Sequence, residues 1–260
     1  MSASTILSPH PLEPDILILM LKVVVGILVI VGLALVLLKL FTSSPQKLVQ
    51  TNIAVNSDDP PLKLKSIGVN FSDFKFTKDK LEFNRLFMDY GFVIPANTTS
   101  TGKDKANPQP TFVVPLGTPA RSLVDGVVVA IPTLWSGDYS VLVTTDGKMQ
   151  KWVYETEHLI NPKVKVGDKV TAGQIVGEVS DFNKGAPKGF GSVEIGILKG
   201  GNPPEHVCPF AFLDESIKEE TLASIKTLYL SWESYIGNKT LYDENSYQVP
   251  GCLTLDSIPG

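Results

Sequence analysis

The sequence predicts a mainly β domain with one N-terminal transmembrane helix and one C-terminal α-helix packed on the β domain. Three observations predict this fold class. Residues 164–179 read VKVGDKVTAGQIVGEV, where valines and isoleucines alternate with polar residues around two glycine-containing turns. Such alternation is typical of short antiparallel strands. Residues 16–41 are almost wholly apolar, and apolar residues recur at helical spacing after position 214.

The N-terminal segment predicts a membrane anchor. The only charged residues between positions 16 and 41 are two lysines. A helix of that length spans about 39 Å, enough to cross a bilayer core of about 30 Å. A cleavable signal peptide is the alternative, but the start carries Glu13 and Asp15 and no basic residue. We therefore expect a disordered tail at 1–15, an uncleaved spanning helix at 16–41 and a polar linker at 42–62.

Residues 63–213 are expected to form the β domain together with an N-terminal extension. A short helix is expected near residues 80–90, within that extension. Asp146-Gly147 is a strong hairpin signal, because both residues accept the positive φ that a tight turn between strands requires. Alternating apolar patterns predict strands at 111–115, 126–132, 139–145, 150–155 and 190–198.

Residues 214–260 are expected to form a helix followed by a loop-like tail. Ser216 and Glu219 have the spacing of a capping box, which predicts the start of the helix. Gly237 predicts its end, because glycine accepts the left-handed conformation of a C-cap. Apolar residues at helical spacing predict a face that packs on the β domain, and they are Leu222, Ile225, Tyr229, Trp232 and Ile236.

Two glycine-containing phrases of the β domain resemble the lysostaphin-type (LytM-like) zinc endopeptidases, which cut peptidoglycan peptides. Residues 114–120, VPLGTPA, are similar to that family's GTPV phrase, and residues 164–179 to its VxxGDxVxxGQ phrase. His158, in Glu-His-Leu, resembles the end of its YxHL phrase. The resemblance covers residues 90–213 and implies a duplicated hybrid-motif β fold. A fold does not imply its function, so the catalytic positions have to be considered one by one.

The zinc ligands of the resembled family are replaced in this chain. In register with residues 114–120, the family's HxxxD pair falls on Asn107 and Thr111, and its HxH pair on Phe190 and Ser192. None of these four is a normal zinc ligand. Only His158 keeps the family's residue, at the position of the assisting base. The resemblance therefore implies a degenerate groove without catalytic residues, without a metal and without zinc as cofactor.

A count of histidines also indicates that the zinc ligands are missing, and it needs no alignment. The chain has three histidines, His10, His158 and His206, and no HxH after the apolar segment.

The first hypothesis for the function is a membrane-anchored, non-catalytic module of the cell envelope, whose partner is peptidoglycan or a cell-wall hydrolase. The second is an active zinc endopeptidase with displaced ligands. The third is a biotinyl- or lipoyl-like adaptor modified at Lys169. The net charge of −4 argues against nucleic acid as a partner.

The two cysteines, Cys208 and Cys252, bracket the predicted helix and are candidates for a disulfide. Two separate buried thiols are the alternative, because free cysteine is commonly buried. A disulfide persists only in an oxidising compartment, so it would place the C-terminal domain outside the cytoplasm, as the resemblance also implies. The lysines around the apolar segment slightly favour the opposite orientation.

Overall fold

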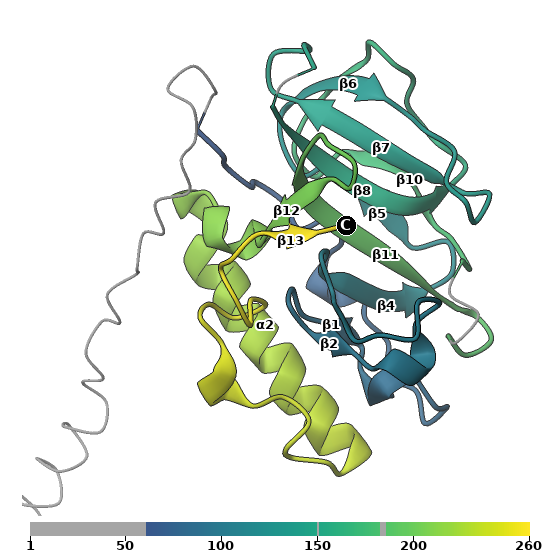
Figure 1. The fold of residues 1–260 in the computed structure, drawn as a ribbon, viewed down its shortest axis with the longest axis vertical. Coiled ribbons are helices and arrows are strands. Elements are labelled where there is room, and N and C mark those ends of the chain that lie inside the picture. Colours follow the sequence, from purple (N-terminus) through teal and green to yellow (C-terminus); the bar gives the residue numbers. More distant parts are fainter. Residues whose placement is uncertain (1–60, 150, 183–185) are drawn as a thin grey trace, which may run out of the picture. The chain divides into compact units, whose positions relative to one another are not determined.

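A computed structural model describes residues 61–149, 151–182 and 186–260 (Figure 1). The predicted tail at 1–15 and the predicted spanning helix at 16–41 lie outside these residues, as does nearly all of the predicted linker. Within the described part of the chain, no helix is both long enough and apolar enough to cross a membrane.

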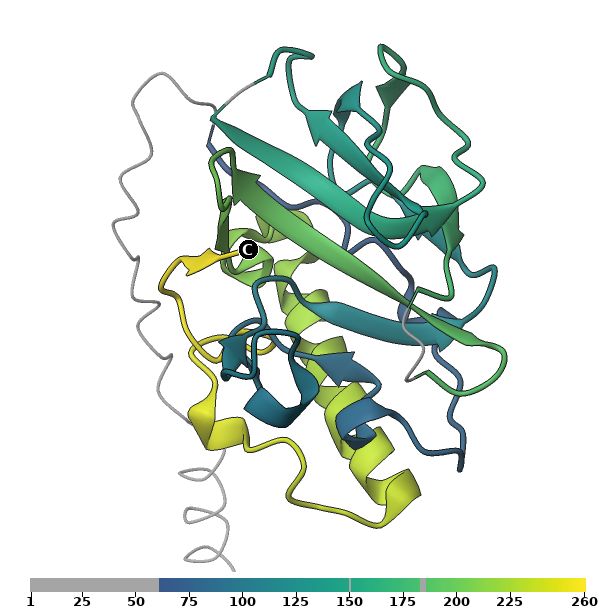
Figure 2. The same ribbon diagram turned by 45° about the vertical axis from the view of Figure 1, so that its right-hand side comes forward.

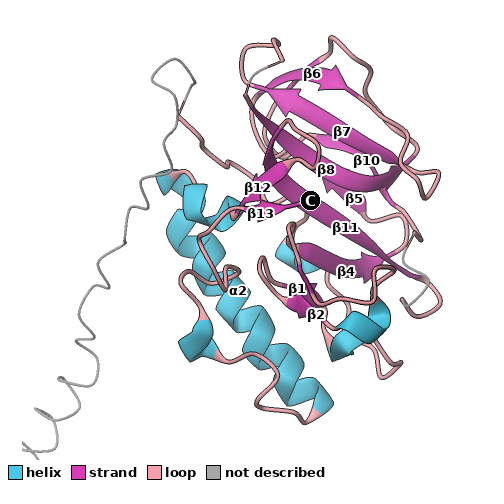
Figure 3. Ribbon diagram, viewed as in Figure 1, coloured by secondary structure: helices cyan, strands magenta, loops and turns pink. Residues whose placement is uncertain are grey.

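The described residues form a mainly β structure with one long C-terminal helix (Figure 3). The helices are the short 3₁₀ turns η1 (Phe71–Asp73), η2 (Glu82–Asn84), η3 (Ala96–Thr98), η4 (Pro209–Phe212) and η5 (Glu244–Ser246), and the α-helix α2 (Glu215–Ile236). The strands are β1 (Phe87–Met88), β2 (Val93–Ile94), β3 (Lys105–Ala106), β4 (Thr111–Pro115), β5 (Pro119–Arg121), β6 (Gly126–Ala130), β7 (Tyr139–Thr144), β8 (Trp152–Ile160), β9 (Lys169–Val170), β10 (Ile175–Val179), β11 (Phe190–Lys199), β12 (Glu205–Val207) and β13 (Ile258–Pro259).

One antiparallel sheet dominates the fold, with the strand order β1-β4-β11-β8-β7-β6-β9. The long strands β8 and β11 lie side by side at its centre (Figure 2). Two short pairs branch from this path: β10 joins β5 to β8, and β12 joins β13 to the edge of β11. Strands β2 and β3 form a separate small sheet.

The two faces of β11 have opposite characters. Val193, Ile195 and Ile197 point to one side and are fully buried in the main hydrophobic core. Glu194 lies between them in sequence, so its side chain points to the other side. Its backbone pairs with Thr111 on β4 and with Glu157 on β8. One face of the central sheet is therefore the core, and the other carries polar groups.

Most predicted strands are present, with one large extension. The strands predicted at 111–115, 126–132, 139–145 and 190–198 correspond to β4, β6, β7 and β11. The strand predicted at 150–155 instead starts at Trp152 and continues to Ile160. Its second half begins with the polar run Thr156, Glu157 and His158 and carries no alternation of apolar residues. This half is a strand because it pairs with both β7 and β11.

The two turns predicted within residues 164–179 are present, because Gly167 and Gly173 have φ of 93° and 80°. The alternating segment before the first turn does not form a strand. There the Asp168 carboxylate accepts a hydrogen bond from the backbone N–H of Lys165 (3.0 Å), which closes the chain into a turn. Strand β9 begins only after this turn, and exposed Lys169 lies within it instead of at a hairpin tip.

Two predictions about helices need correction. The helix predicted near residues 80–90 is wrong, because this stretch contains only the 3₁₀ turn η2, followed by strand β1. The N-cap of α2 is Asp214, whose carboxylate accepts from the backbone N–H of Ser216 (3.0 Å), so the capping box predicted at Ser216 is also wrong. The predicted end is confirmed: Gly237 has φ of 75°.

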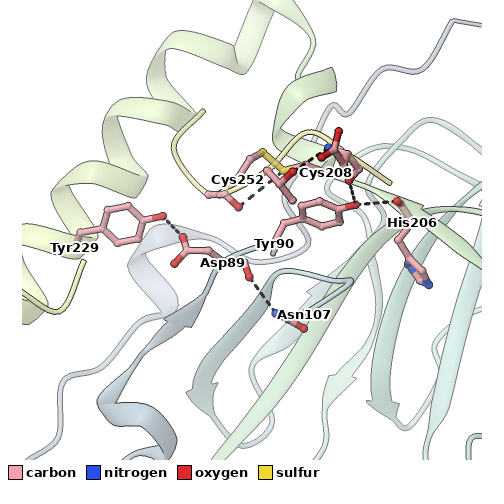
Figure 4. Close-up of a disulfide and its surroundings, with 10 residues drawn as sticks. Asp89, Tyr90, Asn107, His206, Cys208, Tyr229 and Cys252 are labelled. Carbon is pink, nitrogen blue, oxygen red and sulfur yellow. Dashed lines mark hydrogen bonds between the residues drawn. A yellow bond between two sulfur atoms is a disulfide. The ribbon is translucent and has the colours of Figure 1, made fainter. Parts of the chain in front are cut away.

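Helix α2 packs on the N-terminal extension, on β1 and on the C-terminal tail. The Tyr229 ring stacks on Phe87 at 5.9 Å, and Trp232 Nε1 donates to the carbonyl of Asn84 (2.7 Å). Tyr229 also donates to the fully buried carboxylate of Asp89 (Figure 4). Burial raises the pKa of Asp89 to about 6, although hydrogen bonds from Tyr229 and the charge of Arg85 oppose this rise.

A disulfide joins Cys208 to Cys252 and fastens the C-terminal tail to the sheet (Figure 4). The Tyr90 hydroxyl lies 2.8 Å from the carbonyl oxygens of His206 and Asp256. Strand β13 then pairs with β12, so that Ile258 lies opposite His206. The tail thus runs along the edge of the sheet beside a histidine.

We predict that the double variant Cys208→Ser, Cys252→Ser unfolds more easily than the wild type. The disulfide closes a loop over a sequence separation of 44. In the chain-entropy model such a loop contributes about 4 kcal/mol to the free energy of unfolding. Urea unfolding at equilibrium measures this difference, and reduction of the wild type should reproduce it. Equal unfolding midpoints for the variant and the oxidised wild type would contradict the prediction.

Candidate functional site

A cavity of about 440 Å³ lies against the polar face of the central sheet. Strands β8 and β11 provide one wall, and β3, β12 and the segment between β3 and β4 provide others. Its lining is rich in ionisable side chains, which are Lys105, Glu155, Glu157, His158, Glu194 and His206.

Three glutamates converge in the cavity because of strand geometry. Glu155 and Glu157 are two residues apart on β8, so both point to the same face. Glu194 lies opposite Glu157 across the β8–β11 ladder. Glu155 accepts hydrogen bonds from the Ser140 hydroxyl and from Gln109 Nε2 (3.1 Å).

Burial makes these carboxylates weak acids. Burial, together with the charge of Glu157, raises the pKa of both Glu155 and Glu194 to about 8. Burial also raises the pKa of Glu157. Lys105 is the positive group that opposes the shifts of Glu157 and Glu194. The cluster therefore retains protons near neutral pH, or it must gain a positive partner to ionise fully.

His158 has a fixed orientation within a β-bulge. Its φ is 66°, and the pairing of β7 with β8 shifts register next to it. His158 Nδ1 lies 3.0 Å from Asp138 Oδ2, and the imidazole stacks on Phe182 with ring centroids 3.2 Å apart. Asp138 also accepts from the hydroxyls of Ser136 and Ser180.

The environment of His158 selects a neutral ring with a free acceptor. Burial lowers its pKa, and the charge of Asp138 opposes this effect. With Asp138 accepting at Nδ1, the other nitrogen, Nε2, is the acceptor of the neutral imidazole. Nε2 lies 3.9 Å from Glu157 Oε1. His158 thus presents a lone pair beside the glutamates.

The residues at the resembled family's metal positions do not fit zinc. Asn107 Nδ2 donates to the carbonyl of Asp89 (3.2 Å) and to Thr111 Oγ1 (3.5 Å). Thr111 Oγ1 lies 3.2 Å from both Gln109 O and Glu194 Oε1 and donates to one of them. An amide and a hydroxyl held in this way offer no metal-binding electron pair comparable to a histidine or a carboxylate.

The predicted groove residues do not all meet at one site. Asn107 and His158 line the cavity, and Thr111 contacts its Glu194. Phe190, at the start of β11, and Ser192 are not among the lining residues. Ser192 is fully buried, and its hydroxyl has no hydrogen-bond partner within the described residues.

Sequence reasoning missed the glutamates and Asp138. A signal for two of them was present, because Glu155 and Glu157 alternate directly before His158. Glu194 interrupts an apolar strand in the same way. Within the described residues, Glu157, His158 and Glu194 each offer a ligand atom, and these atoms all lie within 4.8 Å of one another. This group could hold a cation, but it is not the family's ligand set.

No family model matches the chain. Over 68 residues the chain is 41% identical to the glycyl-glycine endopeptidase ALE-1 of Staphylococcus capitis. This match covers 25% of the chain and 18% of the relative, so it spans less than a fifth of the relative's length. It confirms the resemblance to lysostaphin-type endopeptidases over that segment.

Solved structures of such peptidases also align with the chain. Lysostaphin from Staphylococcus simulans aligns at 19% identity over 55% of this chain and 50% of its own, with a TM-score of 0.38. A mutant catalytic domain of the prophage-encoded M23 protein EnpA from Enterococcus faecalis aligns at 22% identity over 57% of this chain and 94% of its own, with a TM-score of 0.33. These TM-scores are low, so the resemblance to lysostaphin-type endopeptidases is supported by the sequence match and not by the structural alignments.

We predict that the free energy of unfolding falls as the pH rises from 6 to 8. The folded-state pKa of Glu155 and Glu194 is about 8, above the ordinary value. The folded protein therefore binds more protons than the unfolded chain in this range, and its stability decreases with pH, by on the order of 2 kcal/mol per carboxyl.

The variant Glu194→Gln keeps the shape of the side chain but cannot ionise, so its stability should depend less on pH. Urea unfolding at pH 6, 7 and 8 measures the effect. Glu219→Gln, an exposed position on α2, is the matched control and should retain the wild-type dependence. The prediction fails if the wild type and Glu194→Gln lose stability equally over this range.

Proposed function

We propose that the chain is a membrane-anchored, non-catalytic LytM-like module that binds a cell-wall peptide in the cavity beside β8 and β11. In this proposal residues 16–41 anchor the module in the membrane. Through the bound peptide, or through contact with a cell-wall hydrolase, the module acts in binding or regulation at the envelope.

One observation carries the non-catalytic part of this proposal. The positions that would hold a hydrolytic zinc are occupied by Asn107 and Thr111, whose side chains are committed to hydrogen bonds within the protein. A zinc hydrolase needs about three protein ligands and an open position for water. The cavity nevertheless remains, and it is large enough for part of a peptide.

The peptide class follows from the sequence relative. That relative is named as a glycyl-glycine endopeptidase, so oligoglycine is the first ligand to test. Trp135 is 86% exposed and lines the cavity, so it offers an aromatic surface for a peptide backbone.

We further propose that this domain lies outside the cytoplasm. The disulfide between Cys208 and Cys252 supports this location, because such bonds persist in oxidising compartments. Cell-wall peptides are also found on that side of the membrane.

The full-length protein in detergent is expected to bind pentaglycine without cleaving it. Isothermal titration calorimetry measures the binding, and mass spectrometry of the peptide after overnight incubation detects cleavage. Trp135→Ala should weaken binding by about tenfold, since an aromatic contact in a binding site is worth roughly 1 kcal/mol or more.

Leu230→Ala is the matched control for this substitution. Leu230 is also an exposed apolar residue, but it lies on α2 and is not among the cavity-lining residues. Its loss should leave the affinity for pentaglycine unchanged. Absence of binding by the wild type, or equal losses in the two variants, would count against the cavity as the peptide site.

An active metallopeptidase with displaced ligands is the second candidate. The observation in its favour is the convergence of Glu157, His158 and Glu194. The two candidates differ in metal content.

We predict that protein purified without chelators carries far less than one zinc per chain, and that EDTA leaves its melting temperature unchanged.

Elemental analysis by mass spectrometry and thermal unfolding with and without EDTA measure these quantities. One zinc per chain, together with chelator-sensitive cleavage of pentaglycine, would replace the first candidate by the second. In that case Glu157→Gln should lose both the zinc and the cleavage, while Glu219→Gln should keep them.

A further inference from the structure

The cavity has an excess of carboxyl groups that the peptide-binding proposal does not explain. Its lining contains three glutamates but only one lysine, Lys105. Two of the three glutamates, Glu155 and Glu157, lie on β8, and Glu194 lies on the neighbouring β11. Uncompensated carboxylates in a buried site are costly unless a positive charge joins them. Oligoglycine backbone alone would not supply that charge.

The acceptors of this site match the hydrogen atoms of a primary ammonium group. Glu157, His158 and Glu194 place one acceptor atom each within 4.8 Å of one another. A protonated primary amine carries three N–H donors. Around one nitrogen with charge-assisted hydrogen bonds of about 2.8 Å, three acceptors at tetrahedral angles lie roughly 4.6 Å apart. Separations of at most 4.8 Å are compatible with three acceptors around one ammonium nitrogen.

Asp138 prepares His158 for this role. It accepts at Nδ1 (3.0 Å), so the neutral imidazole presents the Nε2 lone pair toward Glu157. Asp138 itself is held by the hydroxyls of Ser136 and Ser180, which fixes the ring orientation. A neutral histidine and two carboxylates provide three acceptors.

A second, independent group in the cavity also lacks a partner. His206 lies on β12, is 3% exposed and lines the same cavity. Its Nδ1 forms no hydrogen bond within the described residues. Its ring points away from the disulfide (Figure 4). A buried polar atom without a partner within the described residues leaves a hydrogen-bonding position available to a ligand group.

The cavity also has room and apolar surface for an aliphatic stem. Its volume of about 440 Å³ is far larger than a single ion needs. Trp135 and Phe182 line it together with the acceptors. An alkylammonium side chain can place its methylene groups against such rings while its head reaches the carboxylates.

We propose that the cavity binds a primary ammonium group on an aliphatic chain, with Glu157, Glu194 and His158 Nε2 as its three acceptors. This inference rests on the proposed function, because a cell-wall peptide with a free amino side chain would then be the ligand. It narrows the class of ligand from wall peptides in general to those that carry an unmodified amine.

The experiment compares two small probes on the full-length protein in detergent, in the presence of EDTA. The first probe is Nα-acetyl-lysine N-methylamide, and the second is the same compound acetylated on its side-chain nitrogen. Calorimetry should show the free amine binding at least tenfold more tightly, because the acetylated probe loses the charge and two of three donors. Glu157→Gln and Glu194→Gln should each weaken the free amine about tenfold, whereas Glu219→Gln should not.

Each outcome decides the proposal. Equal affinity of the two probes, or no binding of the free amine at millimolar concentration, would overturn it. If a glutamine variant fails to fold, the comparison of the two probes on the wild type is sufficient by itself. Two results together would assign the three acceptors to a metal ion instead. Without EDTA, bound zinc would prevent the free amine from binding, and with EDTA the free amine would still not bind.

Calorimetry with one more probe, N-acetylated pentaglycine, separates this inference from the proposed function. If N-acetylated pentaglycine binds but the two lysine probes do not differ, the peptide-binding function stands and the ammonium site does not. If the free amine binds selectively but no wall peptide does, the ammonium site stands and the wider function fails.

Discussion

The antiparallel pairing of β11 with β8 is the interaction on which the rest of this structure depends. These two strands form the centre of the sheet, and each has one apolar and one polar face. Because strand side chains alternate, the register that buries Val193 and Ile195 also brings Glu194 opposite Glu157. A shift by one residue would place glutamates in the core. The core and the acidic cavity are therefore two results of one register.

The acidic face has an energetic cost that the surrounding residues reduce only in part. Gln109 and Ser140 donate hydrogen bonds to Glu155, and Thr111 Oγ1 lies 3.2 Å from Glu194, but burial still keeps the pKa of both glutamates high. Apolar residues of similar size are often more stable than buried ionisable groups in such a position. This cost supports the proposal that the cavity binds a positively charged ligand group.

The C-terminal segment is connected to the same cavity by two routes. Asn107, at a predicted groove position, donates to the backbone of Asp89, and the Asp89 side chain accepts from Tyr229 on α2. The disulfide holds the tail whose strand β13 pairs with His206. The helix and tail are thus more than a covering for the core, because they position two of the cavity's side chains.

The sequence by itself determined the β class, the turns at Gly167 and Gly173 and the end of α2 at Gly237, because these depend on local conformation. Only the tertiary structure decided that β8 continues beyond residue 155, that α2 packs on the extension and that Asp138 pairs with His158. These depend on contacts between segments far apart in sequence. The acidic site shows the division most clearly: Glu157 and Glu194 were visible as residues, but only the β8–β11 register makes them neighbours.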